Sequence, residues 1–157
     1  MKMKMMTALA VSGILVLAGC GTAKEETNES EQIPNPYTEV ESIEKAEEIT
    51  GFTLDVPEWT GNRTVQVMDE KMIEVIDFNG EEEVRRFRKA SGTDDISGNY
   101  NNYSDVKEEE INGNTVTLKG TDGAYELAVW NDGSYSYAVS TVEMSESEFV
   151  KIIEAVK

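Results

Sequence analysis

A cluster of oxygen-bearing side chains between residues 94 and 105 is the part of the sequence best suited to hold a metal ion. Carboxylate and amide oxygens are the ligands that Ca²⁺ prefers. The alternating acidic order of an EF-hand loop is absent here, and a cluster in so acidic a chain is also typical of a solvated loop. The sequence therefore leaves two interpretations, a solvated loop or a weak calcium site with the ligands Asp94, Asp95, Asn99 and Asp105.

An Asp-Gly pair at residues 132–133 predicts a hairpin that gathers aromatic side chains. With a two-residue turn, Trp130 would pair with Tyr135 and Ala128 with Tyr137. Such a stripe is typical of a reinforced core, or of a shallow groove that takes a peptide, glycan or lipid. Trp130, Tyr135 and Tyr137 are therefore candidate ligand-binding residues, with structural reinforcement as the alternative.

The composition excludes most common hydrolase mechanisms. The chain has no histidine and one cysteine, so it lacks the residues for Ser-His-Asp triads, Cys-His dyads and the usual zinc sites. A pair of carboxylates could hydrolyse glycans, but the spacing of the 31 acidic residues singles out no pair. We expect a protein that is not an enzyme and has no cofactor, with a carboxylate-pair hydrolase of cell-envelope glycan as the alternative.

Basic residues concentrate in one short segment that contains Arg85, Arg86, Arg88 and Lys89. We expect these side chains to neutralise carboxylates across a sheet, with binding of an anionic ligand as the alternative. The chain as a whole carries a formal net charge of -17. A polyanion gains no counterion-release free energy on a nucleic acid, so nucleic acid is not an expected partner.

The first twenty positions have the layout of an export signal. Lys2 and Lys4 precede an uncharged apolar run, which is shorter than the about 20 residues of a transmembrane helix. The run ends in Leu-Ala-Gly-Cys at residues 17–20, which closely resembles the lipobox of bacterial lipoproteins. This resemblance implies cleavage before Cys20 and a diacylglyceryl group on its sulfur, and two acyl chains hold a protein stably at a membrane.

Three segments follow from this layout. Residues 1–19 are expected to form a lipoprotein signal peptide, and residues 20–36 a lipidated cysteine with a flexible acidic tether, because this stretch is nearly devoid of large apolar side chains. Residues 37–157 provide enough apolar material for one domain with one core.

Hydrophobic periodicity predicts an α+β fold for residues 37–157: a curved antiparallel meander of about six or seven strands, packed with a short N-terminal helix and a C-terminal amphipathic helix. The longest loop is expected at residues 91–103, and Ser145 and Glu148 predict a capping box for the last helix. The first helix is expected over residues 42–49, and the strands over residues 52–56, 63–68, 71–78, 104–111, 115–120, 124–131 and 134–142.

Asn-Gly at residues 79–80 is the strongest short-range signal for a hairpin. A two-residue turn at these positions would pair Glu74 with Arg85 and Met72 with Phe87. Opposite charges across the ladder would then stabilise the hairpin.

The motifs at residues 73–76 and 130–137, together with the helix that Ser145 begins, resemble an uncharacterised bacterial domain of unknown function. That family occurs at the C-termini of extracytoplasmic lipoproteins and membrane-tethered regulators, mostly in Gram-positive bacteria. The resemblance covers most of residues 40–157. It implies a sheet-and-helix domain distantly like lipoprotein-carrier or envelope-stress sensor folds, and it implies no catalytic residue.

Taken together, these features predict a lipoprotein anchored to the outer face of the bacterial cytoplasmic membrane, in a Gram-positive organism. Its expected role is to bind or sense a peptide, a glycan, a lipid or an envelope protein. A calcium-stabilised structural lipoprotein is a further alternative.

Overall fold

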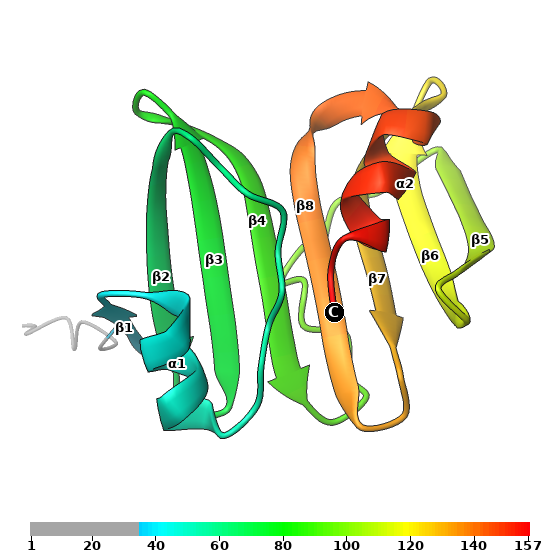
Figure 1. The fold of residues 1–157 in the computed structure, drawn as a ribbon. Coiled ribbons are helices and arrows are strands. Elements are labelled where there is room, and N and C mark those ends of the chain that lie inside the picture. The colour runs from blue at the N-terminus through cyan, green and yellow to red at the C-terminus, as the bar shows by residue number, and fades with distance from the viewer. Residues whose placement is uncertain (1–34) are drawn as a thin grey trace, which may run out of the picture. The chain divides into compact units, whose positions relative to one another are not determined.

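The computed structural model describes residues 35–157, which form one open antiparallel sheet and two helices (Figure 1). The signal peptide, Cys20 and nearly all of the tether expected from the sequence lie outside the described residues. In chain order the elements are β1 (Tyr37–Val40), α1 (Ile43–Thr50), β2 (Asn62–Met68), β3 (Met72–Asn79), β4 (Glu82–Ser91), β5 (Asp105–Ile111), β6 (Asn114–Thr121), β7 (Ala124–Asn131), β8 (Tyr135–Ser145) and α2 (Glu146–Glu154).

The sheet consists of two four-stranded meanders joined side by side. Its strand order is β1-β2-β3-β4-β8-β7-β6-β5, so β4 pairs with β8 rather than with the next strand along the chain. The α+β class and the antiparallel sheet are confirmed, but the expected single meander of six or seven strands is wrong, because the sheet has eight. After β4, the chain passes through residues 92–104 to the far edge of the sheet and returns strand by strand.

Two sequence predictions fail at the N-terminal end of the domain. The first element is β1 and not a helix, because a four-residue strand is too short to show a period. Residues 52–56 form no strand, although Phe52 and Leu54 are buried in the core. This extended segment exchanges two backbone hydrogen bonds with Lys157, of 3.1 and 3.2 Å, and its alternation reflects packing against the core.

Helix α2 begins at the cap that the sequence predicts, and α1 begins beside Ser42, where the sequence places the start of the first helix. The Ser42 hydroxyl accepts a hydrogen bond of 3.2 Å from the Lys45 amide, and α1 ends at Gly51, whose φ of 78° is the left-handed conformation that favours glycine. At α2, the Ser145 amide donates to the Glu148 carboxylate at 3.3 Å. This bond is the reciprocal half of a capping box.

The turns explain which predicted registers fail. The β3–β4 turn contains Gly80 and Glu81, and a bulge lies beside Asp77, so Glu74 pairs with Arg88 and not with Arg85. For the same reason Met72 pairs with Ala90 and not with Phe87.

The β7–β8 turn spans four residues instead of two, because Asn131 pairs with Ser136. The Asp132 carboxylate accepts hydrogen bonds of 2.8 Å from the amides of Ser134 and Tyr135 and so fixes this longer turn. Trp130 therefore pairs with Tyr137 and not with Tyr135.

The register also corrects the second pair expected in this hairpin, because Ala128 faces Val139 and not Tyr137. The slip is two residues, so each side chain stays on the face of the sheet that the sequence predicts.

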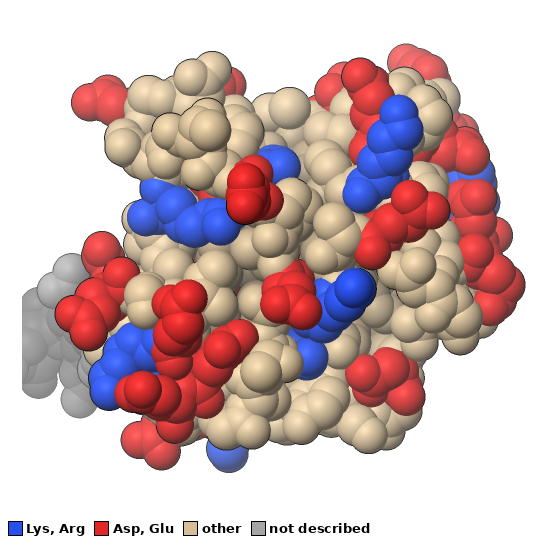
Figure 2. Space-filling model, viewed as in Figure 1, with Lys and Arg blue, Asp and Glu red and all other residues tan. Residues whose placement is uncertain are grey.

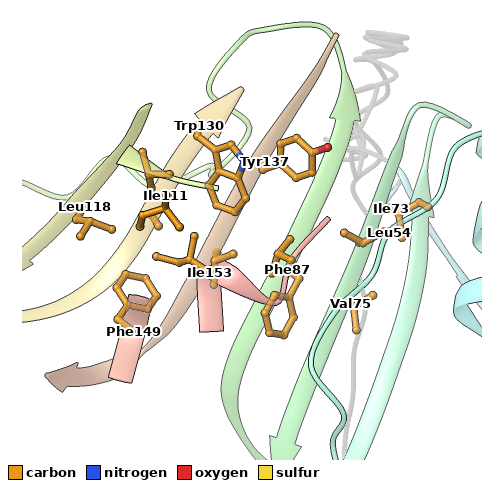
Figure 3. Packing of buried hydrophobic residues seen from close by; sticks show 14 of the residues in the cluster. Leu54, Ile73, Val75, Phe87, Ile111, Leu118, Trp130, Tyr137, Phe149 and Ile153 are labelled. Carbon is orange, nitrogen blue, oxygen red and sulfur yellow. The ribbon is translucent and has the colours of Figure 1, made fainter. Parts of the chain in front are cut away.

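One face of the sheet carries the main core beneath α1, α2 and the segment 51–61 (Figures 1 and 3). On the outer surface of this side, acidic side chains gather over α1 and along the rim near α2 and β5 (Figure 2). Neither helix described between residues 35 and 157 is long and apolar enough to cross a membrane. The largest fully buried apolar side chains are Phe87, Phe149, Leu54, Ile73, Leu118, Leu127 and Ile153.

Neither of the two described helices lies on the opposite face, which is crossed by the loop of residues 92–104 (Figure 1). Strand alternation places a second, smaller apolar layer there. Its members are buried but do not belong to the main core cluster: Met72, Ile76, Ala90, Leu127 and Ala138.

Candidate functional site

The candidate site is the helix-free face together with the loop 92–104, here called the loop-bearing face. The loop has a fixed path because sheet residues hold its backbone. Arg88 Nη1 donates to the carbonyl oxygens of Ile96, at 3.1 Å, and Ser97. The Gly92 amide donates to the Ser134 carbonyl at 2.9 Å.

A buried carboxylate positions Arg88 beneath the loop. Glu74 is fully buried and accepts hydrogen bonds from Gln66, Arg86 and Arg88. Arg86 also binds Glu83 through two bonds of 2.8 and 2.6 Å, and this pairing raises the pKa of the Arg86 guanidinium. The expectation that the basic cluster neutralises carboxylates across the sheet is confirmed for Arg85, Arg86 and Arg88, but not for Lys89, which donates to the Thr53 carbonyl.

Three hollows surround the loop. The first, the acidic hollow, has a volume of about 280 Å³. Its polar lining consists mainly of carboxylate, hydroxyl and amide groups, contributed by Asp94, Asp95, Glu108, Thr115, Thr117 and Asn131.

The other two hollows lie on the β3–β4 side of the loop and share Arg88, Gly98 and Tyr100. The arginine hollow, of about 440 Å³, is lined by Arg86, Arg88, Asn99, Tyr100, Asn101 and Ser140. The methionine hollow, of about 340 Å³, is mainly apolar and is lined by Tyr37, Met68, Met72, Ala90, Ile96 and Tyr100.

The structure distributes the candidate calcium ligands over separate places. Asp94 and Asp95 line the acidic hollow, whereas Asn99 lines the arginine hollow and donates to the Tyr103 hydroxyl at 2.8 Å. Asp105 accepts from the Gly123 amide at 2.7 Å. In residues 35–157, no three Asp, Glu, Cys or His side chains are grouped so that they could hold a metal ion. Calcium binding stays a prediction.

Asp95 is also poorly suited to general-acid catalysis. Burial alone would raise its pKa, but hydrogen bonds from Ser97 and the nearby Lys119 ammonium outweigh burial and leave the pKa below its usual value. A glycosidase acid needs a raised pKa. The acidic hollow therefore gives the hydrolase alternative no support from Asp95.

The aromatic candidates lie mainly in the core. Trp130 and Tyr137 stack with ring centroids 5.0 Å apart and interplanar angle 1°, and they are only 8% and 6% exposed (Figure 3). Both border the acidic hollow, but alternation along β7 directs the side chains of Val129 and Asn131 to that side. This arrangement supports reinforcement of the core, and ligand binding by the aromatic rings stays a prediction.

The side chain of Lys89 lies over the rings of Tyr135 and Tyr137. Lys89 Nζ lies 4.9 Å from the ring centroid of Tyr135 and 5.0 Å from that of Tyr137, and donates to the Thr53 carbonyl at 2.7 Å. Burial lowers the pKa of Lys89. The ammonium thus ties the segment 51–61 to the sheet through a cation–π cluster.

The β7–β8 turn should make stability depend on pH through Asp132. Burial alone would raise the pKa of this carboxyl, but bonds from the Tyr135 and Ser134 amides, the Tyr137 hydroxyl and the Lys89 charge outweigh burial and lower the pKa. A lowered folded-state pKa contributes stability above the unfolded-state value of about 3.9, and this contribution is lost as the pH falls through the folded-state pKa.

We therefore expect Asp132→Asn to reduce the free energy of unfolding more at pH 6 than at pH 3, as measured by urea unfolding. Asp122→Asn is the matched control, since Asp122 also lies in a hairpin turn, with φ 53°. If the free energy of unfolding differs between wild type and Asp132→Asn by the same amount at both pH values, the lowered pKa of Asp132 is contradicted.

Sequence reasoning missed most of the lining of the arginine and methionine hollows. Arg86 and Arg88 were expected to neutralise carboxylates, with binding of an anionic ligand as the alternative, and Tyr37, Met72 and Tyr100 were not candidates. Strand alternation places Met72, Arg86 and Arg88 on one face, so correct registers would have brought them together. The contribution of Tyr100 depends on the path of the loop, which has no period.

The protein is therefore an α+β domain with one open sheet. The two described helices lie on one side of the sheet, and the loop 92–104 runs over the three hollows on the other side. The chain belongs to the family described as Domain of unknown function (DUF4367), whose model matches residues 29–156. The expected membership of a domain family of unknown function is thus confirmed. No curated protein and no solved structure gave a significant match.

Proposed function

We propose that this protein is a non-enzymatic binding or sensing module whose ligand lies on the loop-bearing face. The observation that carries this proposal is the presence of three hollows around one loop, on the face that the helices leave free. Binding sites are typically concave, and loops held on a rigid scaffold often carry them. Tyr100, at 95% exposure, offers an aromatic contact that has no role in the core.

The charges around the loop favour an extended ligand that is cationic at one end and anionic at the other. Asp94, Asp95 and Glu108 line the acidic hollow, and none of the basic residues described between 35 and 157 does so. Lys71, Arg86 and Arg88 line the two hollows on the other side. A ligand that crosses the loop would therefore place its cationic part over the first hollow.

The proposed location is the outer face of the bacterial cytoplasmic membrane, with a diacylglyceryl group on Cys20 as the anchor. The lipobox-like residues 17–20 support this part of the proposal. A Cys20→Ser variant is expected to leave the membrane fraction, and mass spectrometry of the native protein should find Cys20 at the N-terminus with two acyl chains. Native protein with an unmodified cysteine would overturn the anchor.

Hydrogen exchange of the full chain tests binding. The probes are a short-peptide library, cell-wall glycan fragments and phospholipid vesicles. At least one class is expected to slow exchange in residues 92–104 and in β4, and to raise the melting temperature. Protection confined to α1 and α2 would place the site on the helix-bearing face and contradict the proposed location of the ligand. The binding proposal fails if none of the three probe classes changes either measurement.

A further inference from the structure

The methionine and arginine hollows together have the chemistry to take an apolar group joined to an anion. The methionine hollow is lined by Met68, Met72 and Ile96, with Tyr37 and Tyr100 at its aromatic walls. Methionine side chains adapt to irregular apolar shapes, which suits a hollow that accepts more than one apolar side chain. This hollow shares Arg88 with the arginine hollow beside it.

Lys71 supplies an uncompensated positive charge at this place. The carboxylates of Glu74 and Glu83 pair with Arg86 and Arg88, whereas Lys71 forms no ion pair among residues 35–157. Among residues 35–157, Asp95 is the one acidic residue that lines either hollow. In a chain with 14 basic and 31 acidic residues, this surface is complementary to an anion.

Arg88 adds hydrogen-bond donors to that charge. Its Nε donates to Glu74 and its Nη1 to the loop carbonyls. Within the described part of the chain, the second terminal nitrogen of Arg88, Nη2, forms no hydrogen bond. A guanidinium nitrogen held in this way is a ready donor to a carboxylate oxygen.

The neighbouring edge of the sheet favours a peptide over an acyl chain. Tyr37 belongs to β1, and no described strand pairs with the outer side of β1. An extended peptide beside this edge can form backbone hydrogen bonds, which a fatty acid cannot.

We infer that the two hollows bind the carboxyl terminus of a peptide whose last residue is apolar. The terminal side chain enters the methionine hollow, and the terminal carboxylate lies between Lys71 and Arg88. Tyr100 covers the bound residue from the loop. This inference rests on the proposed function, because it names the ligand class of the same face.

Fluorescence anisotropy with the full chain tests this inference. The probe is a labelled pentapeptide that ends in phenylalanine with a free carboxylate. The same peptide with a C-terminal amide is the comparison probe, and unlabelled decanoate is the competitor. We expect the amide to bind at least about tenfold more weakly, a change of about 1.4 kcal/mol. Decanoate is expected to compete poorly.

Two exposed positions provide variants that should fold normally. Lys71→Glu and Tyr100→Ser are each expected to weaken binding of the free-carboxylate peptide about tenfold at unchanged melting temperature, since surface substitutions alter stability by about 0.5 kcal/mol or less. Lys151→Glu is the matched control, because it makes the same charge change on α2. Its affinity should equal that of the wild type within twofold, allowing roughly for long-range charge effects.

The outcomes separate the inference from the proposed function. Equal binding of acid and amide peptides, or equal binding by wild type and Lys71→Glu, overturns the inference. Stronger binding of decanoate than of the peptide assigns the hollows to an acyl ligand and also overturns it. If no peptide binds but another probe protects residues 92–104 from exchange, the inference fails and the proposed function stands. Both fail if no probe changes either hydrogen exchange or the melting temperature.

Discussion

Phe87→Ala is expected to lower the free energy of unfolding by about 3–5 kcal/mol. Phe87 is fully buried at the centre of the sheet, on β4, with Val75 and Val139 as its cross-strand neighbours. Removing the ring leaves a cavity that the rigid strands on both sides cannot close, so the loss includes both burial and packing.

Urea unfolding at pH 7 measures this change for Phe87→Ala. Val106→Ala is the control, because Val106 also lies on a strand but is 57% exposed at the edge of the sheet. Its effect should be within about 1 kcal/mol of zero. A Phe87→Ala loss no larger than that of the control would contradict the placement of Phe87 in the core.

Asp77→Ala should produce the second large loss, about 3–5 kcal/mol. The buried Asp77 carboxylate binds Arg63 through contacts of 2.6 and 3.0 Å and Arg85 through contacts of 2.9 and 2.5 Å. Without it, two guanidinium groups with little exposure lose their counter-charge. Because Arg63 also donates to the Pro57 carbonyl at 2.8 Å, the segment 51–61 should loosen as well.

The measurement is again urea unfolding, combined with hydrogen exchange of residues 51–61. Glu83→Ala removes a carboxylate from an exposed ion pair with Arg86 on the same hairpin, and should cost less than about 1 kcal/mol. Similar losses for Asp77→Ala and Glu83→Ala would show that burial of Asp77 adds nothing to its contribution.

The local elements of the fold were predictable, because each depends on neighbouring residues. The Ser145 cap and the turns between the expected strands 104–111, 115–120 and 124–131 lie where the sequence places them. These turns contain Asn112-Gly113 and Asp122-Gly123. Both turns have positive φ at both central residues, as a type I′ turn requires.

Pairing between distant strands was not predictable, because no local pattern encodes it. The β4–β8 pairing joins residues about fifty positions apart, among them Phe87 and Val139. The bulge beside Asp77 and the four-residue turn that Asp132 holds shift two registers. The hollows depend on these registers and on the path of the loop 92–104. Of their lining residues, the sequence therefore indicated Asp94, Asp95, Asn99, Trp130 and Tyr137 as candidates, and Arg86 and Arg88 as an alternative anion site, without showing how they group.

The pairing of β4 with β8 also constrains the order in which the chain can fold. The first meander, β1 to β4, is synthesised complete, but the strand that closes its open side is the last of the eight. Until β8 emerges, β4 presents an unpaired edge with Phe87 uncovered, a state that favours association with other chains. Pairing of β4 with β8 requires contacts between residues far apart in the chain, so we expect this step to limit the folding rate.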